Sequence, residues 1–301
     1  MDGIINVYKE AGFTSHDVVA KLRGILHQKK IGHTGTLDPE ATGVLPVCCG
    51  KATKVCELLT DKDKSYRAVC RLGIETDTQD LTGNILNKYD TGDLTEENIR
   101  KCVSEFQGDI MQIPPMYSAL KVNGKKLYEL AREGKTIERK ARPVHIDSID
   151  IIDIDLDNNT FTMDVTCSKG TYIRTLCHDI GKKLGIAAAM ESLIRTRVSI
   201  FELENAMTLS QIQQLADEGM DRLEEKITKV DSLFPDYPKL YVNERGAKYL
   251  SNGNSLKKKD FLYSDKIMVK DNQSVLIYDE KSCFKAIYIL KGREYKVKKM
   301  F

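Results

Sequence analysis

Residues 31–47 read Ile-Gly-His-Thr-Gly-Thr-Leu-Asp-Pro-Glu-Ala-Thr-Gly-Val-Leu-Pro-Val, and no other stretch of the chain is as specific. Its Asp38 lies among three glycines and is followed by a proline. Glycine admits backbone conformations closed to other residues, and proline restricts the residue before it, so the loop can hold one carboxylate in a defined pose. An active-site loop needs such a carboxylate, although an ordinary Asx turn uses the same residue types.

A phosphate-binding P-loop is one alternative for this region, because Gly50-Lys51 follow closely. That motif needs a glycine, four residues, and then Gly-Lys-Ser/Thr. Leu45 stands at the position of the first glycine, and Ala52 stands at that of the Ser/Thr. The motif fails at both ends, which excludes an NTPase of this class.

Further motifs follow in order along the chain: 32–39 with 41–47, Gln112–Ala119 with Lys121–Tyr128, and Gly170–Leu176 with Leu193–Arg197. Together they resemble the signature of the bacterial tRNA pseudouridine synthase B family, and the similarity extends from about residue 3 to about residue 210. The resemblance implies an isomerase that converts the T-loop uridine of tRNA (position 55) to pseudouridine.

This isomerisation breaks the N-glycosidic bond, turns the uracil and joins its C5 to the ribose C1′. No group enters or leaves and no redox change occurs, so the resemblance implies that no cofactor is required. One carboxylate suffices to start the reaction, by adding to the uracil C6, by adding to the ribose C1′, or by removing the C2′ proton. These three routes stay open, and Asp38 is the carboxylate that we expect to act.

A glycosidase would instead use two carboxylates that flank the bond. Glu40 lies two residues from Asp38 and could be imagined as the partner. The family pattern is commonly apolar at that position, so we treat Glu40 as incidental to the chemistry.

The resemblance assigns catalytic roles to two more residues. Tyr66 matches a tyrosine at the start of a strand that stacks on the flipped uracil and helps to remove its C5 proton. Arg174 matches an arginine that would hold Asp38 ionised through a bidentate pair and lower its pKa. Without the family pattern, Tyr66 would pass for a core tyrosine and Arg174 for a surface ion pair.

Five residues match substrate-binding positions of the family. Tyr172 and Asp80 resemble the pair that hydrogen-bonds around the target nucleotide, and Leu193 matches an apolar residue of the pocket. His33 would fill the gap that displaced T-loop bases leave. Lys9 matches the lysine of a Lys-Pro-x-Gly-x-Thr/Ser-Ser element, in which this chain has glutamate in place of the proline.

The composition favours a protein of the cytoplasm. The chain has 301 residues, of which 41% are hydrophobic and 30% charged, and no apolar run approaches the ~20 residues that span a membrane. Its first six residues lack the features of a signal peptide. The 8 cysteines include no Cys-x-x-Cys pair and are not spaced with the 5 histidines as in a zinc finger. We therefore expect no metal and no membrane.

The distribution of charge favours RNA more than the net charge of +2 does. Residues 121–142 carry eight Lys/Arg against three Glu, and residues 285–301 carry six against one. Such runs often are only solvated faces, but they also suit a phosphate backbone. We expect the partner to be the T-arm stem-loop of tRNA, bound by a monomer with no obligatory protein partner.

Capping residues and periodicity predict helices that start at Ser15, at Thr95 and at Thr208, the last extending to about Ile227. Alternation predicts strands at 65–72, 160–167 and 193–203. Strands and helices without βαβ regularity favour an α+β domain around a mainly antiparallel mixed sheet. The pseudouridine synthase fold that the resemblance implies is of this kind, with the active site in a central cleft.

Pro235 and Pro238 interrupt the chain after the last of these helices, so we expect a catalytic domain of residues 1–237 and a small domain of residues 238–301. The second domain is expected to contain a helix and three strands, at 243–250, 266–270, 274–278 and 285–290. We interpret it as a small β-barrel that weakly resembles a PUA RNA-binding module.

Three functions remain to be distinguished. The first is a stand-alone tRNA pseudouridine synthase. The second is the catalytic subunit of a guide-RNA particle, which shares the Thr-Leu-Asp-Pro core but usually carries longer basic extensions. The third is a non-catalytic RNA-binding or tRNA-folding module, which would lack Asp38, Tyr66 or Arg174.

Overall fold

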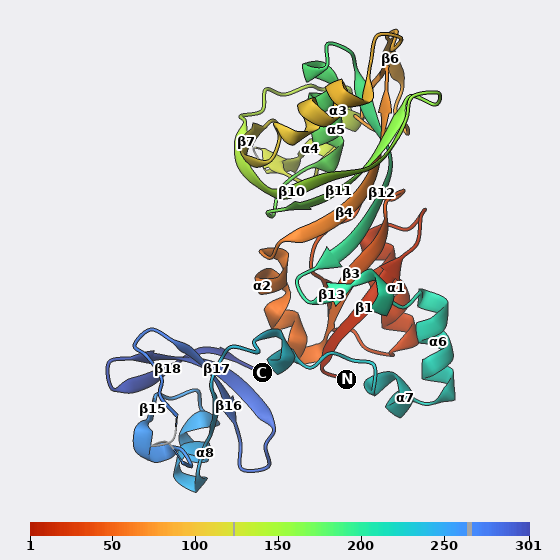
Figure 1. Cartoon of the computed structure of the whole chain (residues 1–301). Coiled ribbons are helices and arrows are strands. Elements are labelled where there is room, and N and C mark those ends of the chain that lie inside the picture. The colour runs from red at the N-terminus through yellow and green to blue at the C-terminus, as the bar shows by residue number, and fades with distance from the viewer. Residues whose placement is uncertain (123, 264–266) are drawn as a thin grey trace.

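The computed structural model describes every residue except 123 and 264–266. Figure 1 shows a long, twisted sheet and, near both chain termini, a smaller sheet. The long sheet has the order β1-β3-β12-β4-β11-β10-β7, with β2 paired to β3 and β13 to β12. Its strands are β1 Gly3–Lys9, β2 Ile31–His33, β3 Thr42–Cys49, β4 Lys64–Leu72, β7 Gly108–Gln112, β10 Arg142–Asp155, β11 Thr160–Cys167, β12 Ala188–Val198 and β13 Phe201–Glu202.

One parallel pair interrupts the antiparallel order of this sheet in the described part of the chain. It joins β3 to β12 through Thr42 opposite Ile194 and Gly43 opposite Arg195. The other pairs of the sheet are antiparallel. The predicted α+β fold with a central, mainly antiparallel mixed sheet is therefore confirmed.

The half of the sheet formed by β4, β11, β10 and β7 is covered on one face only. On β4, Ala68, Cys70 and Leu72 are buried, while Arg67 points outward and pairs with Asp164 at 2.7 Å. The buried face packs against α3 (Glu96–Ser104) and α5 (Ile173–Lys183). Side chains alternate between the two faces of a strand, which is why this segment alternates in sequence.

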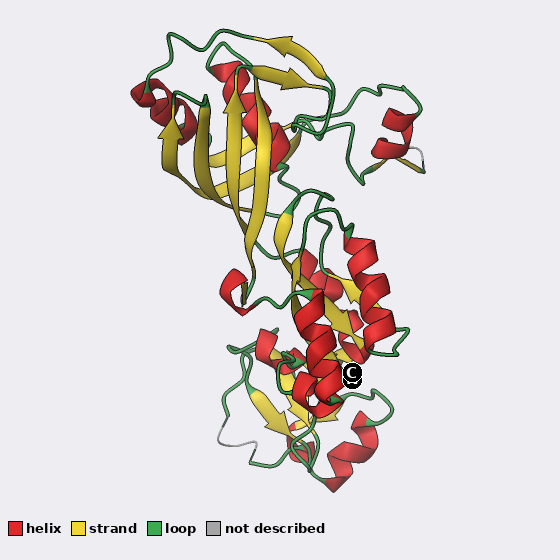
Figure 2. Ribbon diagram, turned by 90° about the vertical axis from the view of Figure 1, so that its right-hand side faces the viewer, coloured by secondary structure: helices red, strands yellow, loops and turns green. Residues whose placement is uncertain are grey.

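The other half is covered on both faces (Figure 2). Leu45 and Val47 of β3 pack against α1 (Ser15–Ile25), α6 (Leu209–Glu218) and α7 (Met220–Glu224). Val44 and Cys48 face the opposite way, toward η1 (Gly50–Val55) and α2 (Cys56–Thr60). A strand buried on both faces is a continuous apolar run, and the segment after the Asp38 loop has that composition.

Two short hairpins and a short helix lie in the connections between strands of the long sheet. They are β5 Ile74–Thr76 with β6 Ile85–Lys88, β8 Lys121–Val122 with β9 Lys125–Lys126, and α4 Leu127–Arg132. Single 3-10 turns complete the chain: η2 Leu203–Asn205, η3 Val230–Leu233 and η4 Lys258–Asp260.

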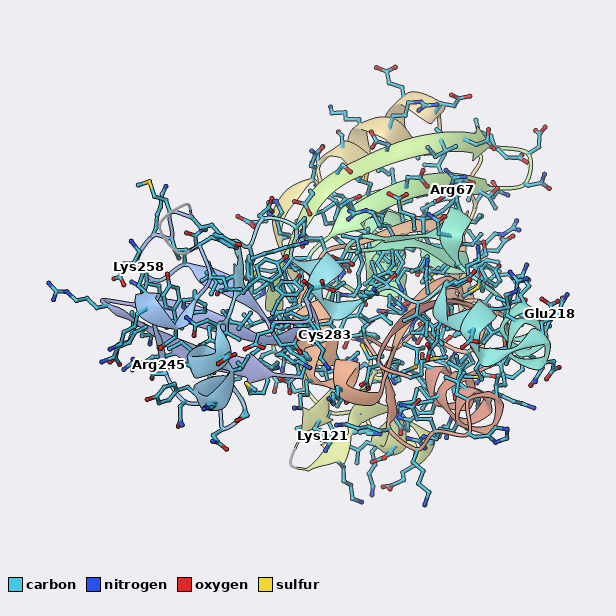
Figure 3. All side chains as sticks on the ribbon, turned by 90° about the horizontal axis from the view of Figure 1, so that it is seen from below. Arg67, Lys121, Glu218, Arg245, Lys258 and Cys283 are labelled. Atoms are coloured by element: carbon cyan, nitrogen blue, oxygen red, sulfur yellow. The ribbon has the colours of Figure 1, made fainter. Side chains whose placement is uncertain are left out.

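The C-terminal segment forms a five-stranded sheet that curls into a half-barrel around its own core. Its strands are β14 Lys239–Tyr241, β15 Leu256–Lys257, β16 Ser274–Tyr278, β17 Phe284–Lys291 and β18 Glu294–Met300, with α8 Glu244–Leu250 beside them. Arg245 of α8 and Lys258 lie on the surface of this unit, away from Glu218 of α6 (Figure 3). The Tyr278 hydroxyl donates to Asp231 at 2.7 Å, which links the unit to the rest of the chain.

The predicted helix starts are close to those observed, and one predicted end is wrong. The N-cap of α1 is Thr14, not Ser15, and its hydroxyl accepts from the Asp17 N–H at 3.1 Å. Thr95 and Thr208 cap α3 and α6 as predicted. The helix expected to reach about residue 227 ends at Glu218, because Gly219 has a φ of +139° that an α-helix excludes.

Two strand predictions need correction. Strands at 65–72, 160–167, 274–278 and 285–290 are confirmed as β4, β11, β16 and β17. The single strand expected at 193–203 is two, because Ser199, with φ +54°, turns β12 into β13. Residues 267–270 form no strand, and residue 266 lies outside the described residues. Strand β18 went unpredicted because its lysines obscure the alternation.

Candidate active site

Hydrogen bonds hold the segment 34–41, between β2 and β3, on both sides of Asp38. Before it, the Leu37 N–H donates to the hydroxyl of Ser15, the first residue of α1, at 3.0 Å. After it, the fully buried ammonium of Lys9 donates at 3.0, 2.6 and 2.7 Å to the carbonyls of Glu10, Phe13 and Pro39. The backbone that carries Asp38 is thereby fixed.

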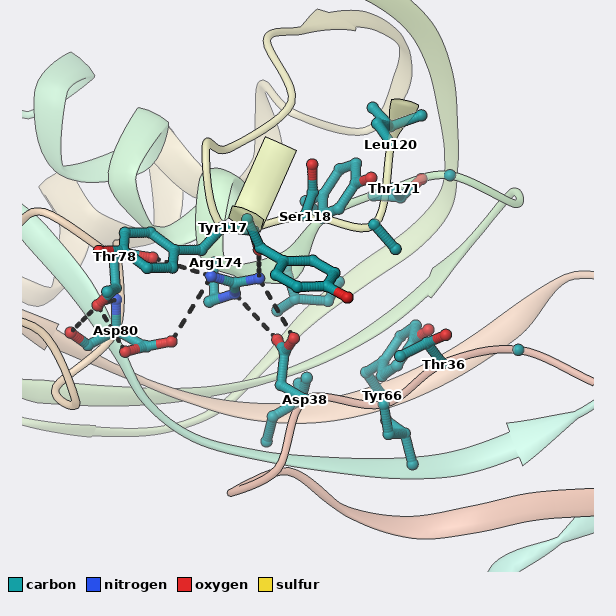
Figure 4. Close-up of a pocket in the computed structure, with 18 of the residues that line it drawn as sticks. Thr36, Asp38, Tyr66, Thr78, Asp80, Tyr117, Ser118, Leu120, Thr171 and Arg174 are labelled. Carbon is teal, nitrogen blue, oxygen red and sulfur yellow. Dashed lines mark hydrogen bonds and ion pairs between the residues drawn. The ribbon is translucent and has the colours of Figure 1, made fainter. Parts of the chain in front are cut away.

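Asp38 faces Arg174 in a two-contact ion pair (Figure 4). Arg174 Nε lies 2.9 Å from Asp38 Oδ2, and Nη2 lies 3.3 Å from Oδ1. Arg174 belongs to the first turn of α5 and is 5% exposed, and its guanidinium also donates to the carbonyls of Tyr117 and Thr78. A planar fork fixed by two carbonyls leaves the carboxylate one orientation. This is the pair that the resemblance implies, and the catalytic roles of its members remain predictions.

Asp80 is a second carboxylate beside the same guanidinium. Its Oδ2 lies 3.7 Å from Arg174 Nη1, while its Oδ1 accepts from the hydroxyls of Thr78 and Thr82 at 2.7 and 2.5 Å. The Thr82 N–H donates to the same oxygen at 3.0 Å. Arg174 therefore links two carboxylates. Asp80 is fixed by hydrogen bonds from neighbouring residues of the loop that carries it.

The pKa of Asp38 is raised above its usual value, mainly because burial removes water from the carboxylate. The charge of Arg174 opposes this shift, and the charge of Asp80 adds to it. Arg174 lowers this pKa as expected, but the loss of water from the carboxylate outweighs the ion pair, so the net shift is upward. The side chain keeps 40% of its surface exposed, so the carboxylate remains accessible.

A cavity of about 1080 Å³ opens in front of this pair. Six of the eight predicted site residues line it: Asp38, Tyr66, Asp80, Tyr172, Arg174 and Leu193. They come from five separate segments of the chain, which the long sheet brings together.

Two adjacent strands, β4 and β12, and the start of α5 form walls of the cavity. Tyr66 of β4 and Leu193 of β12 are 9% and 7% exposed. Tyr172 is the N-cap residue of α5, and the Gln112 side chain accepts from its N–H at 2.7 Å and donates to its carbonyl at 3.0 Å. Burial raises the pKa of the Tyr172 phenol, which keeps it protonated at neutral pH.

Lys9 and His33 do not line the cavity. Burial lowers the pKa of Lys9 to about 8, and its three carbonyl partners make it a support for the loop and leave no donor for a substrate. The ring of His33 packs edge-on against His16, with centroids 5.1 Å apart, and its Nδ1 accepts from the Gly35 N–H at 3.3 Å. Burial lowers the pKa of His33, so the neutral ring keeps Nε2–H as its donor.

On the strands, the structure adds two cations to the cavity that the sequence analysis missed, Lys64 of β4 and Arg195 of β12. Lys64 stands two residues before Tyr66, and Arg195 stands two residues after Leu193. Residues two apart on a strand share a face. Alternation along the strands that carry Tyr66 and Leu193 is therefore the signal that would have identified Lys64 and Arg195 from the sequence.

The described part of the chain contains no group of three or more His, Cys, Asp or Glu side chains placed to hold a metal ion. Among its helices, none has the length and apolar character needed to cross a membrane.

Two family models match the chain. Residues 23–173 match the N-terminal domain of the TruB family pseudouridylate synthases, and residues 174–234 match the C-terminal domain of tRNA pseudouridylate synthase B. The boundary between the two matches falls between Ile173 and Arg174, so the Asp38–Arg174 pair joins the two matched regions.

Among similar proteins, tRNA pseudouridine synthase B of Lachnoclostridium phytofermentans is 52% identical over 96% of this chain and 95% of its own length. The enzyme of the same name from Clostridium perfringens is 42% identical over 100% and 99%. Among solved structures, a chain of an H/ACA RNP bound to a substrate RNA is 26% identical, with a TM-score of 0.73, 99% of this chain covered and 84% of that one. The chain therefore belongs to the TruB family and is a tRNA pseudouridine synthase.

Proposed function

We propose that this enzyme isomerises the T-loop uridine of tRNA at position 55, with Asp38 as the residue that starts the reaction. The observation that carries the proposal is the fixed, partly exposed carboxylate of Asp38, paired with Arg174 at 2.9 Å and facing the cavity beside Tyr66. A uridine in folded RNA is inaccessible, so it must be flipped out of its stack into such a site.

The size and lining of the cavity support a flipped nucleotide as its occupant. Its volume of about 1080 Å³ is at the upper end of the ~300–1,000 Å³ typical of ligand sites, which leaves room for more than a base. Tyr66 offers a ring for stacking and Leu193 an apolar wall, while Tyr172 and Asp80 offer polar groups.

The geometry keeps the three chemical routes open. Asp38 can add to C6 of the uracil, add to C1′ of the ribose, or remove the C2′ proton, and each needs the carboxylate ionised and aimed into the cavity. Its raised pKa makes it a stronger base and nucleophile, while Arg174 keeps it oriented. The cycle is an isomerisation, so it consumes no cofactor.

Two surfaces are proposed to bind the RNA around the flipped base. Arg132 of α4 and Arg142 at the start of β10 line the cavity, within the basic segment 121–142. The domain of residues 238–301, which we interpret as PUA-like, carries the second basic segment on β17 and β18. Phosphate contacts from both would position the T-arm.

The enzyme is proposed to act in the cytoplasm as a single chain. Its 8 cysteines are all free thiols, and four of them, Cys48, Cys49, Cys70 and Cys177, are fully buried. Thiols persist in reducing compartments.

The decisive experiment supplies the purified protein with a short unmodified T-arm hairpin, in excess chelator and without nucleotide, guide RNA or partner protein. Pseudouridine is then mapped at single-nucleotide resolution. We expect one modified position, the T-loop uridine, and none in a hairpin in which that uridine is replaced by cytidine.

The solved structures at TM-scores of 0.71–0.73 include Cbf5–Nop10 complexes, so the guide-dependent function is the alternative that this assay must exclude. If modification requires an added guide RNA or partner protein, the chain is the catalytic subunit of a guide-RNA particle and the stand-alone proposal is wrong. Tight binding without any modification would favour an RNA-folding module.

A further inference from the structure

Arg195 is the most deeply buried cation in the wall of the cavity, at 1% exposed. Its Nε donates to the Val44 carbonyl at 2.7 Å, while Nη1 and Nη2 reach the carbonyls of Thr36 and Gly35 at only 3.5 Å. No carboxylate of the described chain lies within ion-pair distance of it. A buried guanidinium without a counter-ion is costly to maintain, which suggests that it serves a charge that arises during the reaction.

Tyr66 is the residue next to this guanidinium. In the register of β4 against β12, Arg195 stands directly opposite Tyr66, and both side chains line the cavity. The groups that act on the Tyr66 hydroxyl are Arg195 on β12, Cys167 on β11 and Asp38 on the loop. Burial raises the pKa of Tyr66, and Arg195 opposes that rise through its charge and a hydrogen bond.

Lys64 brings a second cation to the same place. It lies two residues before Tyr66 on the same face of β4, is 7% exposed and donates to the carbonyls of Thr60 and Lys62 at 2.9 and 2.8 Å. Lys64 Cε and Arg195 Nη1 both lie within 4 Å of where a Cβ on Gly35 would stand. Burial, followed by the charge of Arg195, lowers the pKa of Lys64 to about 8.

We propose that Arg195, with Lys64 beside it, is the positioning residue that stabilises Tyr66 as a phenolate, so that the tyrosine can remove the C5 proton at the end of the isomerisation. This inference rests on the proposed function. It gives a role to the two buried cations beside Tyr66.

The step balances as follows. The phenolate is the minor form of Tyr66 because burial raises its pKa, and Arg195 enlarges that fraction; in it, the hydroxyl proton has been lost to solvent. After C5 has joined C1′, the phenolate oxygen takes the C5 proton. The electron pair of the C5–H bond forms the C5=C6 double bond, and the pair displaced from C6=N1 goes to N1, which takes a proton from water. The net change transfers one proton from C5 to N1, as an isomerisation requires.

The test compares Arg195→Lys with wild type on three T-arm hairpins, whose target is uridine, 5-deuterouridine or 5-fluorouridine. The last has no C5 proton, so its rearrangement does not need this step. We expect Arg195→Lys to slow uridine conversion by about 10²-fold, in the range of general-base effects. We also expect it to reveal or enlarge a primary deuterium isotope effect while 5-fluorouridine rearranges at the wild-type rate.

The matched control is Arg197→Lys on the same strand, because Arg197 bonds Ser65 and the Ser199 carbonyl and does not line the cavity. It should leave the isotope effect unchanged. If Arg195→Lys does not fold, Lys64→Met provides the second variant and should enlarge the isotope effect in the same direction.

Equal slowing of uridine and 5-fluorouridine, or an isotope effect that neither variant changes, would overturn the inference while the proposed function stands. A wild-type protein that modifies no hairpin would instead remove the proposed function itself. Raising the pH gives a further check. Alkali should increase the phenolate fraction of Tyr66 and so reduce the difference in uridine conversion rate between Arg195→Lys and wild type.

Discussion

Arg174 contacts two carboxylates of the cavity, Asp38 and Asp80, and two backbone carbonyls, so it determines where Asp38 points and how readily Asp38 is ionised. The two effects can be separated by substitution. Lysine keeps the charge but cannot reproduce the fork, whereas methionine removes both.

Arg174→Lys should reduce the single-turnover rate on the order of 10²-fold, because a misplaced reacting group costs about that much. Its pH–rate profile should keep the acid limb of wild type, since the positive charge stays. Arg174→Met should move that limb to higher pH. The reason is that burial already raises the pKa of Asp38, and Arg174→Met removes the positive charge that opposes this rise. An acid limb that stays in place in Arg174→Met would mean that Asp38 is not the group titrating.

At the scale of elements, the site depends on the point where β3 meets β12. Gly43 has a φ of +102°, and a Cβ there would overlap the carbonyl and amide of Arg195. Glycine is required at this position both for its conformation and for the close approach of the two strands. The contact fixes the end of the Asp38 loop against the strand that carries Leu193 and Arg195.

Gly43→Ala should lower the free energy of unfolding by roughly 1–3 kcal/mol, since it combines a strained conformation with a steric overlap. Turnover should fall as well, because the loop and Arg195 move apart. The matched control is Gly24→Ala in α1, where a Cβ meets nothing within 4 Å, and which should stabilise by up to about 1 kcal/mol. Chemical denaturation measures both, and equal stability of the two variants would contradict the proposed packing.

The elements show how far the sequence alone reaches. Alternation places β4 correctly and puts Tyr66 on the buried face, and Thr95 caps α3 as predicted. The end of α6 at Gly219 and the turn at Ser199 depend on positive φ values that periodicity does not report.

In the cavity, motifs identify six of the lining residues but not the electrostatic environment that the fold creates around them. The net rise in the pKa of Asp38 depends on how much water the folded chain removes, and no spacing in the sequence encodes this. Lys9 shows the same limit, because only the fold reveals that its ammonium is already occupied by three carbonyls.

At the scale of the whole molecule, the C-terminal sheet is attached to the catalytic part and is not a free module. Lys54 Nζ donates to the Met300 carbonyl at 2.7 Å, and Phe284 and Phe301 pack against the core beneath β3. Truncation would expose that core, so charge substitutions test the RNA-binding proposal better.

Lys291 and Arg293 are exposed where β17 turns into β18. Replacing both with glutamine should weaken tRNA binding and make the affinity less dependent on salt. Each lost phosphate contact should reduce the slope of log K against log salt by ~0.9. The control pair, Lys101 and Lys182 to glutamine, is exposed on α3 and α5 and should leave the slope unchanged. Equal slopes for both pairs would remove the C-terminal sheet from the RNA-binding surface.

The central claim is that one carboxylate, Asp38, starts the isomerisation. Single-turnover formation of pseudouridine in a T-arm hairpin, at saturating enzyme, tests it with Asp38→Asn against Glu40→Gln. Asparagine is nearly isosteric but cannot act as nucleophile or base, and Glu40 is the exposed carboxylate two residues along. We predict that Asp38→Asn binds the hairpin with wild-type affinity and forms no detectable pseudouridine, while Glu40→Gln reacts at the wild-type rate. Clear product from folded, pure Asp38→Asn would contradict the account.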